Sequence, residues 1–195
     1  MEKLKKNQTF LFIFSLVLFL AVLQCFRTHL IYQADLFFSQ PWRWWTGHWV
    51  HVGWVHYVLN VAVLICLFYL FPDIQKKVTL FLLLILPPLL SFSFHWLYPN
   101  IFAYAGLSGI LHGLFVFCAI VGIWKKQEQR IAWIILVAVM CKIIWEYQFG
   151  ALQTEQLIGA TVLTQAHLLG VCFGGLLALI FLSIHAFVKP AIDSH

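Results

Sequence analysis

Two residues within apolar stretches of the sequence, Ser108 and His167, have the chemistry needed for acyl transfer. Polar groups inside apolar segments are costly to bury and therefore indicate functional sites. A serine hydroxyl becomes an effective nucleophile when a neutral imidazole removes its proton during attack. Taken singly, the serine could bond to its own helix backbone and the histidine to a neighbouring carbonyl. The hypothesis of a Ser–His dyad therefore requires a reason for the two to meet.

Small residues beside both side chains supply such a reason. Ser108 lies between Gly106 and Gly109, which leave the hydroxyl accessible and let another helix approach closely. Gly170 and Gly174 form a GxxxG face that starts one turn beyond the histidine. If this face packs against the helix that carries the serine, the imidazole reaches the hydroxyl.

Three further polar residues could support a dyad. His56 and Asn60 are four residues apart, so they share one face of a helix, and their donors suit a developing oxyanion. They could instead hold neighbouring helices together through polar contacts. His112 lies one turn after Ser108. It could buttress His167 by stacking or hydrogen bonding, or it could be ordinary packing, and the two interpretations remain open.

Lys142 and Glu146 are also four residues apart and can form an ion pair, which lowers the cost of burying both. A Ser–Lys dyad is an alternative arrangement for serine hydrolysis. However, Glu146 would keep the lysine protonated and so unable to act as a base. We therefore expect the pair to be structural or to engage substrate. His48 and His51, near a cluster of tryptophans, are expected to be structural anchors.

The composition places all of these residues in a membrane protein. Of the 195 residues, 63% are hydrophobic and only 10% are charged, too few to cover the surface of a soluble domain. A helix needs about 20 apolar residues to cross a bilayer. Six stretches approach that length: 10–26, 54–71, 78–97, 106–124, 131–149 and 161–188. The sequence therefore predicts an all-α membrane protein built as a bundle of six transmembrane helices.

The positions of the charges predict the topology. The net charge of +5 does not indicate nucleic-acid binding, because the basic residues lie between the apolar runs, mostly at alternate ends. This places both termini in the cytoplasm, with a basic head at 1–8, one membrane domain at 9–188 and a tail at 189–195. The tryptophan-rich segment 31–53 is expected to lie half-sunk in the outer leaflet. The five cysteines have no CxxC spacing, and no disulfide, metal or cofactor is expected.

This topology brings the polar residues to one depth. The second, fourth and sixth spans run inward from the outer side, with Ser108 two residues past the start of its span and Asn60 and His167 about six. At about 1.5 Å per residue, all three lie within roughly 10 Å of the outer boundary. Three separate helices thus carry polar groups at one level, as a shared site requires.

The order and spacing of these motifs resemble the rhomboid family of intramembrane proteases across nearly all of residues 40–180. The resemblance rests on Trp42-Arg43, His51, His56, Asn60, Gly106-Leu107-Ser108-Gly109, and Ala166-His167 followed by Gly170 and Gly174. It implies a six-helix bundle with Ser108 in the fourth helix and His167 in the sixth. It also implies an oxyanion hole of His56, Asn60 and the Ser108 amide, and a role for Arg43 in bracing the first loop.

One departure points to a branch of that family. Common bacterial rhomboids have tyrosine where this chain has His112. Together with Lys142 and Glu146, this histidine makes the chain look like a rhombosortase, a branch associated with exported bacterial proteins that end in a glycine-rich motif, a hydrophobic helix and a basic cluster. The resemblance implies cleavage of such transmembrane tails within the lipid bilayer of the bacterial inner membrane, near its periplasmic face.

Two other classes of protein are alternatives. Histidines within the spans could ligate haem b in an electron carrier, although such a protein has no need of the serine and asparagine beside them. A small transporter would have broken helices and polar groups at the bilayer midplane, whereas the polar residues here are off-centre.

Overall fold

Apolar segments fold as helices in a membrane because a helix satisfies its own backbone hydrogen bonds. The computed structural model describes residues 2–126, 128–151 and 154–192 of the chain. Its long helices are α1 (Glu2–Cys25), α4 (Trp54–Leu70), α5 (Lys76–Leu97), α6 (Ser108–Trp124), α7 (Gln129–Phe149) and α9 (Thr164–Ile192). Its short elements are α2 (Arg27–Leu30), β1 (Tyr32–Gln33), η1 (Ala34–Leu36), α3 (Arg43–Trp49), β2 (Ala103–Tyr104) and α8 (Thr154–Ile158).

The described helices include fewer clear membrane spans than the six predicted. Four are long and apolar enough to cross a bilayer: Asn7–Cys25, Lys76–Leu97, Gln129–Phe149 and Thr164–Ala186. Helices α3 and α4 form a pair bent by 87°, which makes a fifth candidate if it counts as one span. Helix α6 is apolar but has only 17 residues. It begins at Ser108, two residues later than predicted. The protein is thus a largely helical, multi-pass membrane protein, and six crossings remain a prediction.

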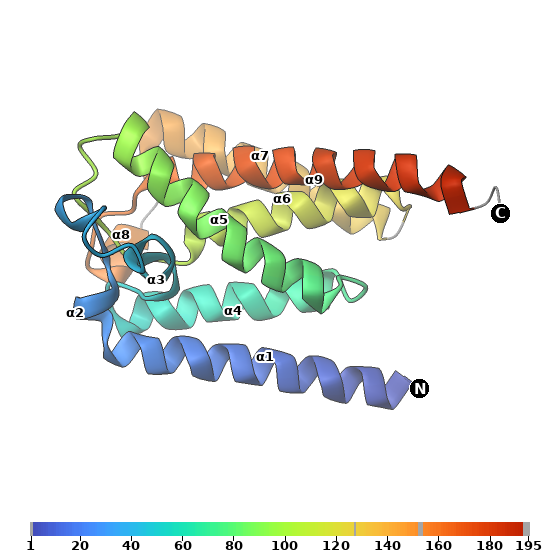
Figure 1. The fold of residues 1–195 in the computed structure, drawn as a ribbon, viewed down its shortest axis with the longest axis horizontal. Helices are drawn as coiled ribbons and strands as arrows, with labels where there is room; N and C mark the ends of the chain where they lie inside the picture. Colours follow the sequence, from blue (N-terminus) through green and yellow to red (C-terminus); the bar gives the residue numbers. More distant parts are fainter. Residues whose placement is uncertain (1, 127, 152–153, 193–195) are drawn as a thin grey trace.

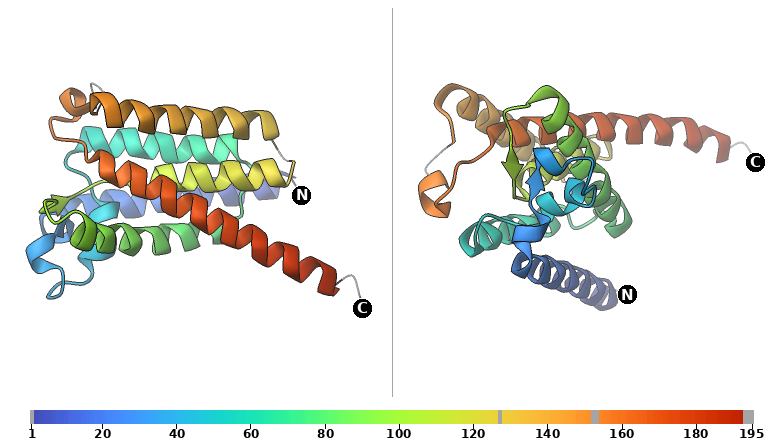
Figure 2. Two further views of the ribbon diagram at one scale, coloured as in Figure 1. Left: turned by 90° about the horizontal axis from the view of Figure 1, so that it is seen from above. Right: turned by 60° about the vertical axis from the view of Figure 1, so that its left-hand side comes forward.

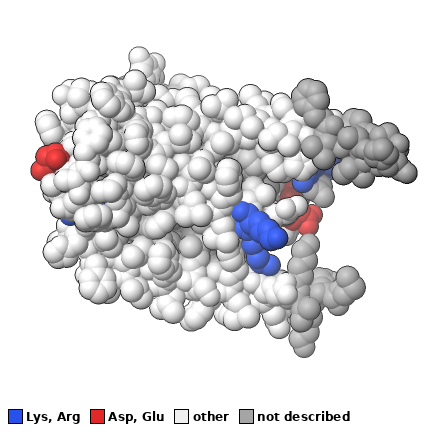
Figure 3. Space-filling view, viewed as in Figure 1, with Lys and Arg blue, Asp and Glu red and all other residues white. Residues whose placement is uncertain are grey.

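The two ends of the bundle carry different parts of the chain (Figure 1). Both termini emerge at one end, whereas α2, α3 and α8 gather at the other. This arrangement agrees with an even number of crossings, and the cytoplasmic location of the termini remains a prediction. Residues 2–8, predicted as a separate basic head, continue helix α1. On the face shown in Figure 3, charged side chains are few and most of the surface is uncharged, as contact with lipid tails requires.

Helix α6 is the centre of the bundle, and α9 packs across it (Figure 2). The contact is close because glycines face each other. A Cβ atom on Gly109 would lie 2.8 Å from the Ala166 carbonyl oxygen, and one on Gly113 would lie 2.9 Å from that of Gly170. A Cβ atom on Gly174 would overlap the Gly113 carbonyl oxygen. The GxxxG face of α9 therefore lies directly on the backbone of α6.

The first loop, residues 31–53, is folded against the segment that precedes Ser108. Strand β1 pairs antiparallel with β2, which joins Tyr32 to Tyr104 in register. The Gly106 amide donates to the Gly47 carbonyl oxygen over 3.1 Å. Burial raises the pKa of both tyrosines to about 12, so their hydroxyls stay neutral. The pairing of β1 with β2 and the bond between Gly106 and Gly47 fix the backbone immediately before Ser108 and set the start of α6.

Two polar side chains brace this loop internally. Arg43 is 6% exposed and donates to Gln40 Oε1 over 2.7 Å and to the Ile31 carbonyl oxygen over 2.6 Å. Gln24, at the end of α1, forms two bonds with the backbone of His51, donating to its oxygen over 2.9 Å and accepting from its nitrogen over 2.7 Å. The family resemblance implies a bracing role for Arg43, whereas the role of Gln24 was not predicted, because its partner lies 27 residues along the chain.

Candidate active site

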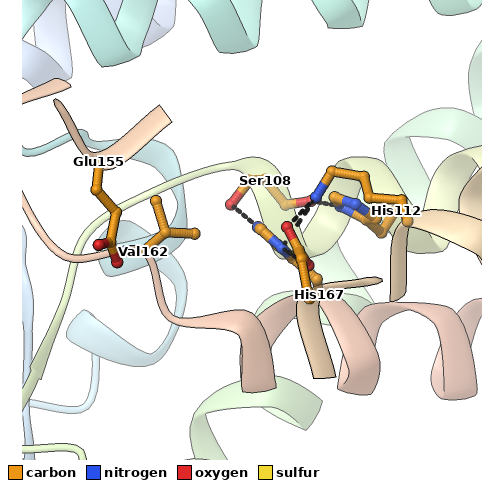
Figure 4. Close-up of polar contacts among 7 residues, drawn as sticks. Ser108, His112, Glu155, Val162 and His167 are labelled. Atoms are coloured by element: carbon orange, nitrogen blue, oxygen red, sulfur yellow. Dashed lines mark hydrogen bonds and ion pairs between the residues drawn. The ribbon is translucent and has the colours of Figure 1, made fainter. Parts of the chain in front are cut away.

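Ser108 is the first residue of α6, and its partly exposed side chain points toward α9 (Figure 4). The first N–H groups of a helix have no partner within it, and the helix dipole makes this end partly positive. The preceding residue, Leu107, supplies no side-chain cap. The amides at the start of α6 therefore lie next to the Ser108 hydroxyl, and the amide of Gly109 also lies close to the Tyr104 hydroxyl.

His167 lies within hydrogen-bond distance of that serine. Its Nε2 atom is 2.9 Å from Ser108 Oγ, although the two residues are 59 positions apart in the chain. The imidazole is 4% exposed and extends from the first turn of α9. The close glycine contact between α6 and α9 holds the two backbones at the separation that this bond needs.

Glu146, on α7, contacts the other side of the same ring. Its Oε2 atom is 2.8 Å from His167 Nδ1, and its Oε1 atom accepts a bond from Lys142. Lys142 Nζ also lies 3.4 Å from His167 Nδ1. Because an ionised carboxylate only accepts hydrogen bonds, Nδ1 carries the proton in this arrangement and Nε2 is left to accept from the serine hydroxyl.

The contact between Glu146 and His167 is not predicted from the sequence, where the spacing pairs Glu146 with Lys142. The positions of the two residues along their helices could have revealed this contact. Glu146 lies three residues before the end of α7, and His167 lies three residues after the start of α9. At about 1.5 Å per residue, both lie roughly 5 Å from their helix ends, which meet at the same side of the bundle. Helical spacing alone identified only the partner on the same helix.

His112 stacks on the outer face of His167. The two rings are nearly parallel, with centroids 4.2 Å apart and an interplanar angle of 18°. His112 Nδ1 lies 2.7 Å from the carbonyl oxygen of Ser108, one turn earlier in α6, as Figure 4 shows. The ring stacks on His167 and its hydrogen bond goes to the helix backbone, and whether this contact buttresses His167 or is ordinary packing remains to be tested.

A stacking role for His112 can be tested by substitution. His112→Phe keeps a flat ring against His167, whereas His112→Ala removes it and lets the imidazole tilt away from Ser108. We expect the alanine variant to lose about tenfold in kcat, and the phenylalanine variant to stay within about threefold of the native chain. Peptide cleavage by the purified variants measures both values. Equal losses in the two variants would show that the stacked ring is not what matters.

His56, on α4, lies beside the segment that leads to Ser108, and Asn60 follows it one turn later in the same helix. The His56 ring packs against Gly106, where a Cβ atom would lie 2.9 Å from its Cε1 atom. The Asn60 amide is 5% exposed and donates over 2.9 Å to the His56 carbonyl oxygen in its own helix. One N–H of that amide is therefore used by the helix and the other is left for a further acceptor.

The two histidines of the first loop, His48 and His51, are buried among other side chains. His48 is fully buried, and its Nε2 atom lies 3.0 Å from Ser91 Oγ on α5. His51 is fully buried and meets the His56 ring edge to face at 5.1 Å. Within residues 2–126, 128–151 and 154–192, no group of three or more His, Cys, Asp or Glu side chains is arranged to hold a metal ion.

The chain matches a known protein family over most of its length. The family model of the Rhomboid domain matches residues 39–184, which include α6, α7 and the part of α9 with the glycine contact. The chain belongs to the Rhomboid domain family. A comparison with curated proteins finds no match. Rhomboid proteins are intramembrane serine proteases that act on transmembrane substrates, so membership supports protease activity for this multi-pass rhomboid.

Proposed function

We propose that this rhomboid is a serine endopeptidase in which Ser108 is the nucleophile and His167 the general base. The observation that carries the proposal is the 2.9 Å contact between Ser108 Oγ and His167 Nε2 at the start of a helix. The scissile peptide bond lies in, or next to, a transmembrane helix of the substrate. Cleavage takes place near the outer face of the membrane.

Each step moves one proton through the imidazole. Ser108 Oγ attacks the scissile carbonyl carbon while His167 Nε2 takes the hydroxyl proton. The tetrahedral intermediate then collapses, and the imidazolium gives that proton to the leaving amine. Water attacks the resulting ester, with Nε2 again acting as base, and releases the carboxylic acid and the free serine.

The negative charge of the intermediate forms next to several donors. The backbone N–H groups at the start of α6 point toward this region, as does the partly positive end of the helix dipole. The ring of His56 borders the same segment, and Asn60, one turn further along α4, keeps a second N–H that its own helix does not use. We assign these groups to the oxyanion hole, where removal of one donor commonly costs about 100-fold or more in kcat.

Water can reach the site from the end that carries the short elements. A cavity of about 270 Å³ is lined by His51 and Tyr104, among other residues of the loops. Both ring nitrogens of His51 are buried without a protein partner. Because His51 contacts His56, this cavity adjoins the proposed oxyanion hole and supports delivery of the hydrolytic water.

The substrate class follows from the resemblance to rhombosortases. His112 and the Lys142–Glu146 pair support assignment to that branch, whose substrates end in a glycine-rich motif, a hydrophobic helix and a basic cluster. Glycine lowers the cost of unwinding a helix by about 1 kcal/mol per residue relative to alanine, which exposes a scissile carbonyl. On the same resemblance to rhombosortases, we assign the chain to the bacterial inner membrane, with the site open to the periplasmic side.

The haem-carrier alternative fits the site less well. Both ring nitrogens of His167 already have partners, Ser108 and Glu146, and one ring nitrogen of His112 bonds to the backbone. The rings of His112 and His167 are stacked face to face 4.2 Å apart, which leaves no room for a metal between them. Axial ligation would require all of these contacts to break.

The proposal is tested with purified protein in liposomes and a fusion substrate that carries a Gly-Gly motif, a hydrophobic helix and a basic cluster. The control substrate has Ala-Ala in place of Gly-Gly. If two glycines lower the unwinding cost by about 2 kcal/mol, cleavage of the first substrate is roughly 30-fold faster. Equal cleavage of both would overturn the substrate assignment. No cleavage of either, with no modification of Ser108 by a fluorophosphonate, would overturn the proposed activity.

A further inference from the structure

We propose that Glu146 completes a Ser–His–Glu triad, in which Lys142 keeps the carboxylate ionised; this inference rests on the proposed function. The family resemblance implies a dyad of serine and histidine only. In the structure, a continuous chain of contacts runs from α7 through α9 to α6. Glu146 Oε2 lies 2.8 Å from His167 Nδ1, and His167 Nε2 lies 2.9 Å from Ser108 Oγ.

Glu146 differs from most residues of its helix because its side chain is buried. Helix α7 lies at the edge of the bundle, and only Ala132 and Glu146 of its residues are buried. Large apolar side chains of the same helix, such as Trp133 and Tyr147, are instead exposed. A charged residue buried where apolar neighbours are exposed requires a specific partner, and that partner is the ring nitrogen of His167.

The carboxylate has two effects on the imidazole. By accepting from Nδ1–H, it holds the tautomer whose Nε2 lone pair faces the serine. It also stabilises the imidazolium that forms when Nε2 takes the serine proton, because the new charge lies next to a fixed negative one. Because Glu146 and His167 are both buried, both effects are larger than they would be at the protein surface.

Lys142 explains how a carboxylate stays charged at this position. Glu146 is 5% exposed, and a lone buried carboxylate would take up a proton and lose one of its accepting positions. The side chain of Lys142 is 37% exposed, and its ammonium group pairs with Glu146 Oε1. The lysine acts on the reaction through Glu146 and is therefore a positioning residue.

The test compares Glu146→Gln with Glu146→Asp, and uses Glu128→Gln at the other end of α7 as a control for charge removal. We expect Glu146→Gln to lower kcat about 100- to 1000-fold, with KM within threefold of the native value. Glu146→Asp restores at least tenfold of that loss, and Glu128→Gln stays within twofold of the native chain. If the role of Glu146 were purely structural, Glu146→Gln would instead lower the unfolding temperature and leave kcat per folded molecule unchanged.

A double substitution keeps the test valid if a lone charge unfolds the protein. Lys142→Met is expected to lower kcat about tenfold in the native background and to have no further effect when Glu146→Gln is present. If Lys142 instead engages substrate, Lys142→Met raises KM in both backgrounds, which would overturn its assigned role. The double variant removes both charges together, so it leaves no unpaired charge in the bundle.

A spectroscopic measurement reports the hydrogen bond directly. In ¹⁵N NMR spectra of the native chain, His167 should show a protonated Nδ1 and an unprotonated Nε2, and Glu146→Gln should mix the two tautomers. A native spectrum with the proton on Nε2 would overturn the triad. Throughout, fluorophosphonate labelling of Ser108 in the native chain reports the proposed function separately. Labelling that is equally fast in Glu146→Gln would refute the triad alone.

Discussion

His167→Ala is expected to lower peptide cleavage at least about 10,000-fold relative to the native chain, and Ser108→Ala is expected to do the same. The reason is that the two groups act as a unit. Without the imidazole no base removes the hydroxyl proton, and without the hydroxyl there is no nucleophile for the base to activate. The double variant should therefore be no slower than either single variant, because catalysis by a dyad is not additive.

Matched controls for these two substitutions exist on α9. His185 is exposed, and its Nδ1 atom lies 3.0 Å from the Phe181 carbonyl oxygen in the same helix. Ser183 is exposed and donates to the Leu179 carbonyl oxygen over 2.9 Å. His185→Ala and Ser183→Ala should both cleave within twofold of the native rate. Cleavage by His167→Ala within tenfold of the native rate would show that another group is the base.

The second large effect is expected from one added methyl group on α9. In Gly174→Ala, the new Cβ atom overlaps the backbone oxygen of Gly113, and a backbone atom cannot move aside as a flexible side chain can. Helices α6 and α9 must separate, which should lower the free energy of unfolding by about 1–3 kcal/mol. A shift of about 1 Å between Ser108 and His167 would also lower kcat about 100-fold.

The adjacent glycine is the control for this substitution. A Cβ atom on Gly175 would lie 3.8 Å from Val116 Cγ1 and 3.9 Å from Ile120 Cδ1, which are ordinary contacts. Gly175→Ala should therefore keep native activity and gain up to about 1 kcal/mol from the higher helix propensity of alanine. Thermal unfolding and fluorophosphonate labelling of Ser108 measure both properties. Equal stability of the two variants would exclude close backbone packing as the constraint on Gly174.

Local sequence was enough for the class of the protein and to single out the two residues that meet in the candidate site. Helix formation in a membrane depends on apolar length, so most of the long helices fall near their predicted ranges. Ser108 and His167 were singled out because polar side chains are rare in such segments. The spacing of Gly170 and Gly174 marks the face of α9 that lies against α6.

Other features were decided only when distant segments came together. Helix α6 begins at Ser108, later than predicted, because the residues before it pair with Tyr32–Gln33 in the first loop. The fixed start leaves α6 too short to count as a clear span by length. The 87° bend between α3 and α4 likewise has no counterpart in the apolar pattern, which has no information about how loops fold back.

The contact between His167 and Glu146 shows most clearly that sequence spacing does not determine which residues of different helices meet. The sequence placed Lys142 and Glu146 on one helical face, because residues four apart are neighbours in any helix. It did not define how α7 is rotated about its own axis relative to α9. That rotation is set by the packing of whole helices, and it directs Glu146 Oε2 to within 2.8 Å of His167 Nδ1. Spacing along the chain thus determined which residues could react, and the tertiary structure decided which of them meet.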